Sequence, residues 1–193
     1  MTNFPILSNK EKKELIDLAN EAADRAREAI LPYFRQNIAV SNKDEQAFDP
    51  VTDADKAAEN AIRKVISLSR PHDGIWGEET GENASSTGFR WVIDPIDGTR
   101  SFISGTPTWG VLISLEQIGS GPILGIIDQP YIRERFIGGL GISEVHGPLG
   151  VRSLKASETQ ALSESKLFTT FPEIGTEKEK IGFDAVAREV KLV

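Results

Sequence analysis

The sequence has 193 residues, of which 39% are hydrophobic and 26% charged, with a formal net charge of −7 and no cysteine. A chain of this size can bury a substantial core, and the absence of cysteine excludes a disulfide framework, a thiolate nucleophile and a cysteine-based zinc site. No run of Lys and Arg favours nucleic acid, no apolar run is long enough for a membrane, and the N-terminus lacks a signal-peptide layout, so we expect a cytoplasmic protein with neither partner.

A long amphipathic helix is predicted near the N-terminus. Ser8 and Glu11 have the spacing of a capping box, and apolar residues then recur at helical spacing. Pro32 is expected to kink or end this helix. The following stretch, SNKDEQAFDP at residues 41–50, is expected to be a polar loop.

A second helix is predicted from Thr52 to Ser69, where Pro71 stops it. Its first turn is acidic, which the helix dipole favours. Thr52 and Asp55 have a spacing similar to that of a capping box. By itself, the stretch DPVTDAD at residues 49–55 is therefore explained as a helix cap.

Short apolar runs separated by Gly, Pro and Ser replace the helical pattern between Gly74 and Gly141. They predict a largely antiparallel sheet with a hairpin turn at residues 119–121. The runs that carry this prediction are FRWVID, WGVLISLEQ, GPILGIIDQ and RERFIGGL.

Beyond this sheet the pattern predicts another strand over residues 166–170 and a helix over about 177–190. The order of elements predicts an α+β or α/β fold, in which two N-terminal helices lie on an antiparallel sheet and a second α/β unit begins. We therefore expect a metal-binding domain of helices and sheet over residues 1–150 and the beginning of a C-terminal α/β subdomain over 151–193.

Two aspartates three residues apart end one of the apolar runs, in the stretch RWVIDPIDGTRSF. Pro95 lets Asp94 and Asp97 converge, and like charges this close repel unless a cation lies between them. The carbonyl between them is expected to be free because the strand ladder ends. These oxygens suit Mg²⁺, while the N–H groups of Gly98 and Thr99 suit an anion. Metal and anion side by side indicate phosphate chemistry.

Two other motifs with closely spaced acids do not fit. Phosphatases with an aspartyl nucleophile carry Asp-x-Asp-Gly-Thr, in which the acids stand two apart on one face of the strand, whereas here they stand three apart across a proline. An EF-hand loop is excluded because the alternating ligands and the terminal Glu are absent.

A further acidic stretch, GEET at residues 77–80, is by itself explained as an exposed loop. Together and in this order, DPVTDAD, GEET and WVIDPIDGTRSF resemble the inositol monophosphatase family of metal-dependent phosphomonoesterases. The stretches FDPVTDAD, GTRSFISGTPTWGVLISL and ILGIIDQPYIRERFIG are most similar to its histidinol-phosphatase branch. The resemblance implies a layered α-β-α-β-α sugar-phosphatase fold, a homodimer and hydrolysis of a small phosphate ester.

The resemblance also implies a set of metal ligands. Glu78, Asp94 and the Ile96 carbonyl would hold the first Mg²⁺, and Asp94 would bridge to a second ion beside Asp97. A complete site would hold two or three Mg²⁺ ions, with Mn²⁺ as a substitute.

Catalytic and phosphate-binding roles follow from the same resemblance. Asp55 and Thr99 would orient the attacking water, with Asp55 as the proton acceptor. The backbone N–H groups at Asp97, Gly98 and Thr99 would receive the phosphate oxygens. Lys43 would lie near the metals.

Histidinol phosphate is the favoured substrate, ahead of an inositol or sugar phosphate and of a nucleotide 3′-phosphate such as adenosine bisphosphate. An alternative of a different class is a fragment that binds metal without catalysis. The family pattern continues for roughly seventy residues beyond this sequence, through a motif that supplies the last aspartate of the second metal. We therefore expect a shortened chain of low activity.

Overall fold

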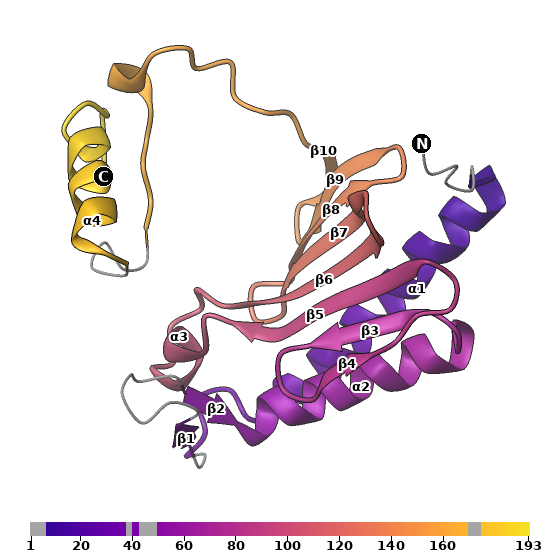
Figure 1. Ribbon diagram of the computed structural model, residues 1–193. Helices are drawn as coiled ribbons and strands as arrows, with labels where there is room; N and C mark the ends of the chain where they lie inside the picture. Colours follow the sequence, from indigo (N-terminus) through magenta and orange to yellow (C-terminus); the bar gives the residue numbers. More distant parts are fainter. Residues whose placement is uncertain (1–6, 38–39, 43–49, 170–174) are drawn as a thin grey trace. The chain divides into compact units, whose positions relative to one another are not determined.

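The computed structural model divides the chain into two compact units, one up to Leu154 and one from Lys155. It describes residues 7–37, 40–42, 50–169 and 175–193 (Figure 1). The helices are α1 (Asn9–Ile30), α2 (Asp53–Ser69), α3 (Thr99–Ile103), the 3₁₀ helix η1 (Leu162–Glu164) and α4 (Glu177–Ala187). The strands are β1 (Val40–Asn42), β2 (Pro50–Thr52), β3 (Gly74–Gly77), β4 (Gly81–Asn83), β5 (Phe89–Asp97), β6 (Gly110–Gln117), β7 (Gly121–Gln129), β8 (Glu134–Gly139), β9 (Ile142–Gly147) and β10 (Gly150–Ser153).

Both N-terminal helices begin and end where the sequence predicts. Ser8 caps α1, with Glu11 N donating to Ser8 Oγ at 3.3 Å and Ser8 N donating to Glu11 Oε2 at 2.7 Å. The helix ends two residues before Pro32, which has no N–H to continue it. Thr52 caps α2 in the same way, and α2 ends two residues before Pro71. The two helices and both capping boxes are confirmed.

The main sheet has eight strands in the order β10-β9-β8-β7-β6-β5-β3-β4. Every neighbouring pair is antiparallel except β3 and β5, which are parallel. The four predicted runs form β5 to β8, and the hairpin between β6 and β7 closes with Ser120 N donating to Gln117 O at 2.8 Å. Strands β3, β4, β9 and β10 were not predicted because they are short and rich in glycine or polar residues.

The predicted polar loop over residues 41–50 is partly wrong. Its two ends belong to β1 and β2, which pair antiparallel with Ser41 opposite Val51. Residues 43–49 lie outside the described residues, and so do the predicted site residue Lys43 and the first aspartate of DPVTDAD, Asp49.

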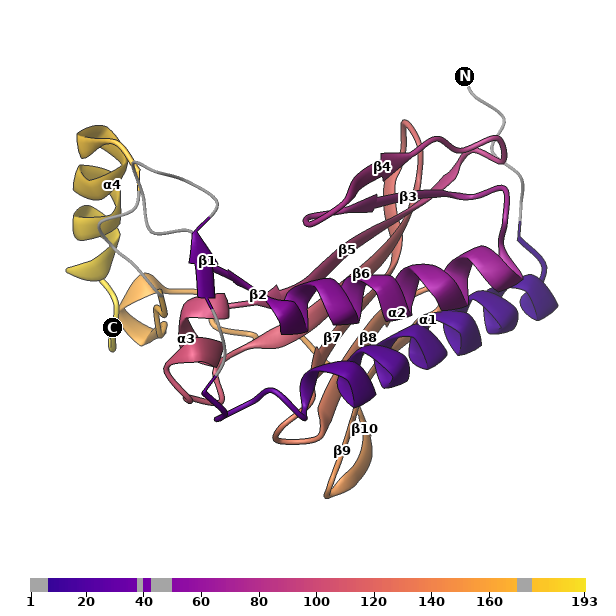
Figure 2. The same cartoon turned by 90° about the horizontal axis from the view of Figure 1, so that it is seen from below.

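Helices α1 and α2 lie side by side across one face of the main sheet (Figures 1 and 2). Along β5, Trp91 and Ile93 are buried, while Val92 and Asp94 are only partly buried. This alternation places the first pair beneath the helices and Asp94 on the opposite face. The largest side chains buried in this core are Trp91, Phe102, Ile30, Ile62, Ile66, Ile93, Ile96, Ile113, Leu115, Leu124, Ile126 and Ile137.

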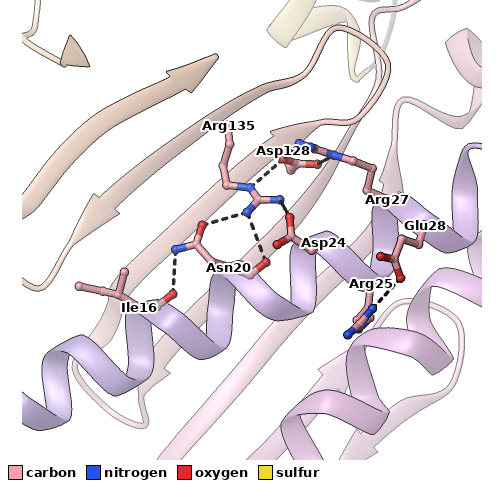
Figure 3. A network of polar contacts seen from close by, with 8 residues as sticks. All are labelled: Ile16, Asn20, Asp24, Arg25, Arg27, Glu28, Asp128 and Arg135. Carbon is pink, nitrogen blue, oxygen red and sulfur yellow. Dashed lines mark hydrogen bonds and ion pairs between the residues drawn. The ribbon is translucent and has the colours of Figure 1, made fainter. Parts of the chain in front are cut away.

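A buried carboxylate fastens α1 to the sheet (Figure 3). Asp128 on β7 is fully buried and accepts hydrogen bonds from Arg27 Nη2 at 2.6 Å and from Arg135 Nε at 2.8 Å. Arg135 also donates to Asn20 Oδ1 at 2.9 Å and to Asp24 Oδ1 at 2.6 Å on α1. A buried charge is tolerated only when it is paired in this way, so the network fixes the helix on strands β7 and β8.

In the second unit, α4 begins at the Thr176 cap but ends at Ala187, three residues before the predicted end. The strand predicted over residues 166–170 is wrong for the described residues. In residues 166–169 the structure has only an isolated parallel bridge, which pairs Lys166, before α4 in the sequence, with Leu192, after it. In the described parts of the chain, no helix combines the length and the apolar character needed to cross a membrane.

Candidate active site

The two aspartates of the motif lie on either side of a bulge in β5. Asp94 pairs with Leu112 and Asp97 with Gly110, so β5 has one more residue between its two pairing positions than β6 has. The predicted end of the ladder is therefore wrong, because the strand continues to Asp97 and only skips Pro95 and its neighbour. A proline fits at a bulge since it has no N–H to donate. The extra residue allows side chains three apart to approach each other.

Residues 78–80 of the GEET stretch form the predicted turn, which joins β3 to β4, whereas Gly77 is the buried last residue of β3. Because β3 is parallel to β5, with Gly77 opposite Ile93, the residue after Gly77 reaches the same end of the sheet as Asp94. Glu78 is exposed and lines, together with Asp94, a hollow of about 660 Å³ on the face opposite the helices. The other walls of this hollow come mainly from apolar residues of the sheet.

Asp94 is the electrostatic centre of this group. Burial, followed by the negative charges of Glu78 and Asp97, raises the pKa of Asp94 from an ordinary 3.8 to about 7. A side-chain hydrogen bond with Glu78 raises this pKa further, and the Ile96 N–H lowers it. Asp94 Oδ1 is buried and has no hydrogen-bond partner in the described part of the chain. A buried oxygen without a partner is costly, so this atom is placed for a ligand.

A divalent cation suits the carboxylates of this site. Glu78 and Asp94 lie within hydrogen-bonding reach of each other, and their carboxylates are hard oxygen ligands. The carbonyl of Ile96, two residues after Asp94, would be a further hard oxygen ligand. Within the described ranges, no three acidic or histidine side chains alone are gathered into a metal cage. The carbonyl and water would therefore have to complete the coordination, which is usual for Mg²⁺.

The loop after Asp97 brings Thr99 to the same place. Thr99 Oγ1 donates to Ile96 O at 3.0 Å, and a carbonyl oxygen retains a second lone pair for another partner. Gly98 adopts a left-handed conformation with φ of 84°, and a Cβ there would come within 2.9 Å of Thr108 O. Glycine is required at this position, and it turns the chain so that the N–H groups of Gly98 and Thr99 precede the first hydrogen bonds of α3.

Asp55 lies in the first turn of α2 and is almost fully buried. Its Oδ2 accepts from Thr52 N at 2.8 Å and from Thr52 Oγ1 at 2.6 Å. The helix-cap explanation of this residue is therefore confirmed.

Sequence reasoning missed Glu59, one turn after Asp55 on α2. Glu59 is fully buried, and Glu79 N donates to its Oε2 at 2.7 Å. The signal was an acid beside Ala58 and three residues before Ile62, two buried positions of the helix, because an acidic residue in an apolar stripe needs partners.

The inositol monophosphatase family model matches residues 11–185 of the chain. The chain belongs to the inositol monophosphatase family. A relative, the chloroplastic bifunctional phosphatase IMPL2 of Arabidopsis thaliana, is 37% identical over 97% of this chain and 56% of its own length. A histidinol-phosphatase of Chlorobaculum parvum is 47% identical over 63% of this chain and 46% of its own length.

Solved structures share the fold. An inositol monophosphatase from Zymomonas mobilis is 34% identical with a TM-score of 0.79, over 96% of this chain and 70% of that structure. The predicted family and the predicted sugar-phosphatase-type fold are thus confirmed. The chain spans about half the length of the curated relatives it matches.

Proposed function

We propose that the chain carries the metal-binding part of a Mg²⁺-dependent phosphomonoesterase, and that its substrate is histidinol phosphate. The observation that carries the proposal is the buried Asp94 Oδ1, which has no hydrogen-bond partner among the described residues and lies beside the charges of Glu78 and Asp97. An acidic group with an orphaned oxygen is destabilised until a cation joins it. The histidinol-phosphatase of Chlorobaculum parvum supports the substrate.

The acidic residues and one backbone carbonyl would bind the metal ions. Glu78, Asp94 and the Ile96 carbonyl would hold one Mg²⁺, and Asp94 with Asp97 would face a second. When bound, these ions supply an acidic water and a positive charge for the departing oxygen. Mn²⁺ has the same ligand preferences and should substitute.

The other residues would handle the water and the phosphate. The Thr99 hydroxyl donates its hydrogen bond to Ile96 O, so the lone pairs of Thr99 Oγ1 can accept a hydrogen bond from the attacking water. Asp55 would take the proton from that water. The N–H groups of Gly98 and Thr99 would donate to the phosphate oxygens as charge develops on them.

An inositol phosphate is the second candidate substrate, because the Zymomonas mobilis structure is that of an inositol monophosphatase at 34% identity. It ranks lower because the histidinol-phosphatase of Chlorobaculum parvum reaches 47% identity. A cytoplasmic location and a homodimer remain expectations.

Phosphate release from histidinol phosphate, inositol 1-phosphate and adenosine 3′,5′-bisphosphate tests the proposal, with Mg²⁺ and with a chelator. We expect release to require Mg²⁺ and histidinol phosphate to have the highest kcat/KM. Asp94→Asn should leave less than about a tenth of the rate, a loss of at least about 1.4 kcal/mol of barrier stabilisation. Metal binding without turnover of any substrate would instead favour the non-catalytic alternative.

A further inference from the structure

We propose that Glu59 is a positioning residue that sets the place of Glu78, acting through the backbone of the turn between β3 and β4. The inference rests on the proposed function, since it takes Glu78 as a metal ligand. Glu59 itself is fully buried, so it would act without touching metal or substrate.

Glu59 binds the turn immediately after Glu78. Its Oε2 accepts from Glu79 N at 2.7 Å, and its Oε1 accepts from Thr80 N at 3.0 Å and from the Thr80 hydroxyl. A carboxylate that accepts two consecutive backbone N–H groups fixes the peptide planes between them. The Cα of Glu78 lies in the first of these planes, so the side chain of Glu78 starts from a fixed point.

Arg63 completes a clamp on the same hairpin. Arg63 Nε donates to Glu59 Oε1 at 2.8 Å, and its other nitrogens donate to Asn83 Oδ1 at 2.7 Å and to the Gly81 carbonyl. Burial raises the pKa of Glu59, but the hydrogen bonds from Thr80, Glu79 and Arg63 outweigh burial and leave the pKa below its ordinary 4.5. The buried carboxylate is therefore ionised and fully used by the hairpin and Arg63.

Gly77 shows how closely the clamp fits. A Cβ at this position would lie 2.6 Å from Glu59 Cδ and 2.8 Å from Arg63 Nη2, so any larger residue would have to displace the Glu59 carboxylate and the Arg63 guanidinium. Glu59 also lies one helical turn after Asp55. Through this residue, the helix that carries the proposed base is joined directly to the turn that carries the proposed ligand.

The test is a double-mutant cycle on the 193-residue chain, with Mn²⁺ affinity measured by calorimetry. Glu59→Gln keeps the shape and leaves Arg63 its two other acceptors, and we expect it to weaken Mn²⁺ binding by about tenfold or more. In the Glu78→Gln background, Glu59→Gln should add no further loss, because the ligand it positions is already gone. A merely structural residue would weaken binding equally in both backgrounds.

Three further variants complete the test. Thr80→Val removes the hydroxyl that donates to Glu59 and should weaken Mn²⁺ binding less than Glu59→Gln does. Thr80→Ser keeps the hydroxyl and should bind Mn²⁺ as tightly as the wild type. Glu82→Gln is the matched control on the same hairpin, since its exposed ion pair with Arg90 contributes little. If Glu59→Gln does not fold, the comparison of Thr80→Val with Thr80→Ser decides. Equal Mn²⁺ affinities of these two variants would overturn the positioning role of Glu59.

The outcomes separate the two proposals. If Glu78→Gln leaves Mn²⁺ affinity unchanged, Glu78 is not a ligand, and both the assigned metal site and the role of Glu59 are wrong. If Glu78→Gln weakens binding but Glu59→Gln does not, only the positioning role is wrong.

Discussion

At the scale of single residues, the site is organised around Asp94. Its carboxylate is half-buried on the face of β5 opposite the helices, and one of its oxygens has no hydrogen-bond partner within the ranges that the structure describes. Asp97 is exposed, and water can therefore solvate its charge. The two aspartates of one motif thus have different environments, and the environment of Asp94 destabilises its anion.

The first prediction concerns the stability of metal-free protein. The folded pKa of Asp94 is raised from 3.8 to about 7, so between these values the native state holds a proton that the unfolded chain has released. This contribution is fully present below about pH 4 and is lost as pH rises to about 7. Urea unfolding with a chelator should show the wild type losing stability relative to Asp94→Asn across this range. Parallel pH profiles would contradict the raised pKa.

The second prediction concerns Thr99. Thr99→Ala removes the hydroxyl that would orient the water but leaves the backbone N–H groups in place. We expect kcat to fall by about a hundredfold while Mg²⁺ affinity stays near its original value. Thr99→Ser is the control and should retain activity. A large fall in metal affinity of Thr99→Ala would move Thr99 among the metal ligands instead.

At the scale of elements, a bulge and a parallel pair bring the acids together. The bulge in β5 lets Asp94 and Asp97 approach, and the parallel pairing of β3 with β5 brings Glu78 to the same end. Helix α2 adds Asp55 at its first turn and Glu59 one turn later. The site is thus built from segments that are far apart in sequence.

The third prediction concerns the turn from β5 into α3. Gly98→Ala places a Cβ on a residue with φ of 84° and against Thr108 O, and should cost about 1–2 kcal/mol of unfolding free energy. Gly125→Ala is the matched control, because no atom lies within 4 Å of the added Cβ. Urea unfolding of both variants checks this. Equal stabilities would mean that Gly98 is not required by its conformation.

Local patterns allowed the long helices to be predicted from the sequence. Ser8 with Glu11 and Thr52 with Asp55 are contiguous signals, as are Pro32 and Pro71 at the ends. The parallel pairing of β3 with β5 could not be predicted, since nothing in the short run GIWG indicates its neighbour.

Within the site, the motifs indicated Glu78 and Asp94, but the bulge was misread as the end of a strand. Glu59 was missed although its place in the apolar stripe of α2 was a signal, because two of its partners are backbone N–H groups about twenty residues away, which no residue type indicates.

At the scale of the whole molecule, the chain consists of two compact units and spans about half the length of its curated relatives. All the described residues of the proposed site lie in the first unit, on α2, β5 and α3 and in the turns that follow β3 and β5. We therefore expect metal binding to depend on this unit, whose α1 is fastened to β7 and β8 through Asp128.

Diffraction from crystals grown with Mn²⁺ tests the central claim most directly, because anomalous scattering locates the ion. We predict a peak about 2.0–2.6 Å from carboxylate oxygens of Glu78 and Asp94 and from the Ile96 carbonyl oxygen. Crystals of Asp94→Asn should lack this peak. A Mn²⁺ peak only at other residues, or no peak in the wild type at saturating Mn²⁺, would contradict the assignment of these residues as the metal site.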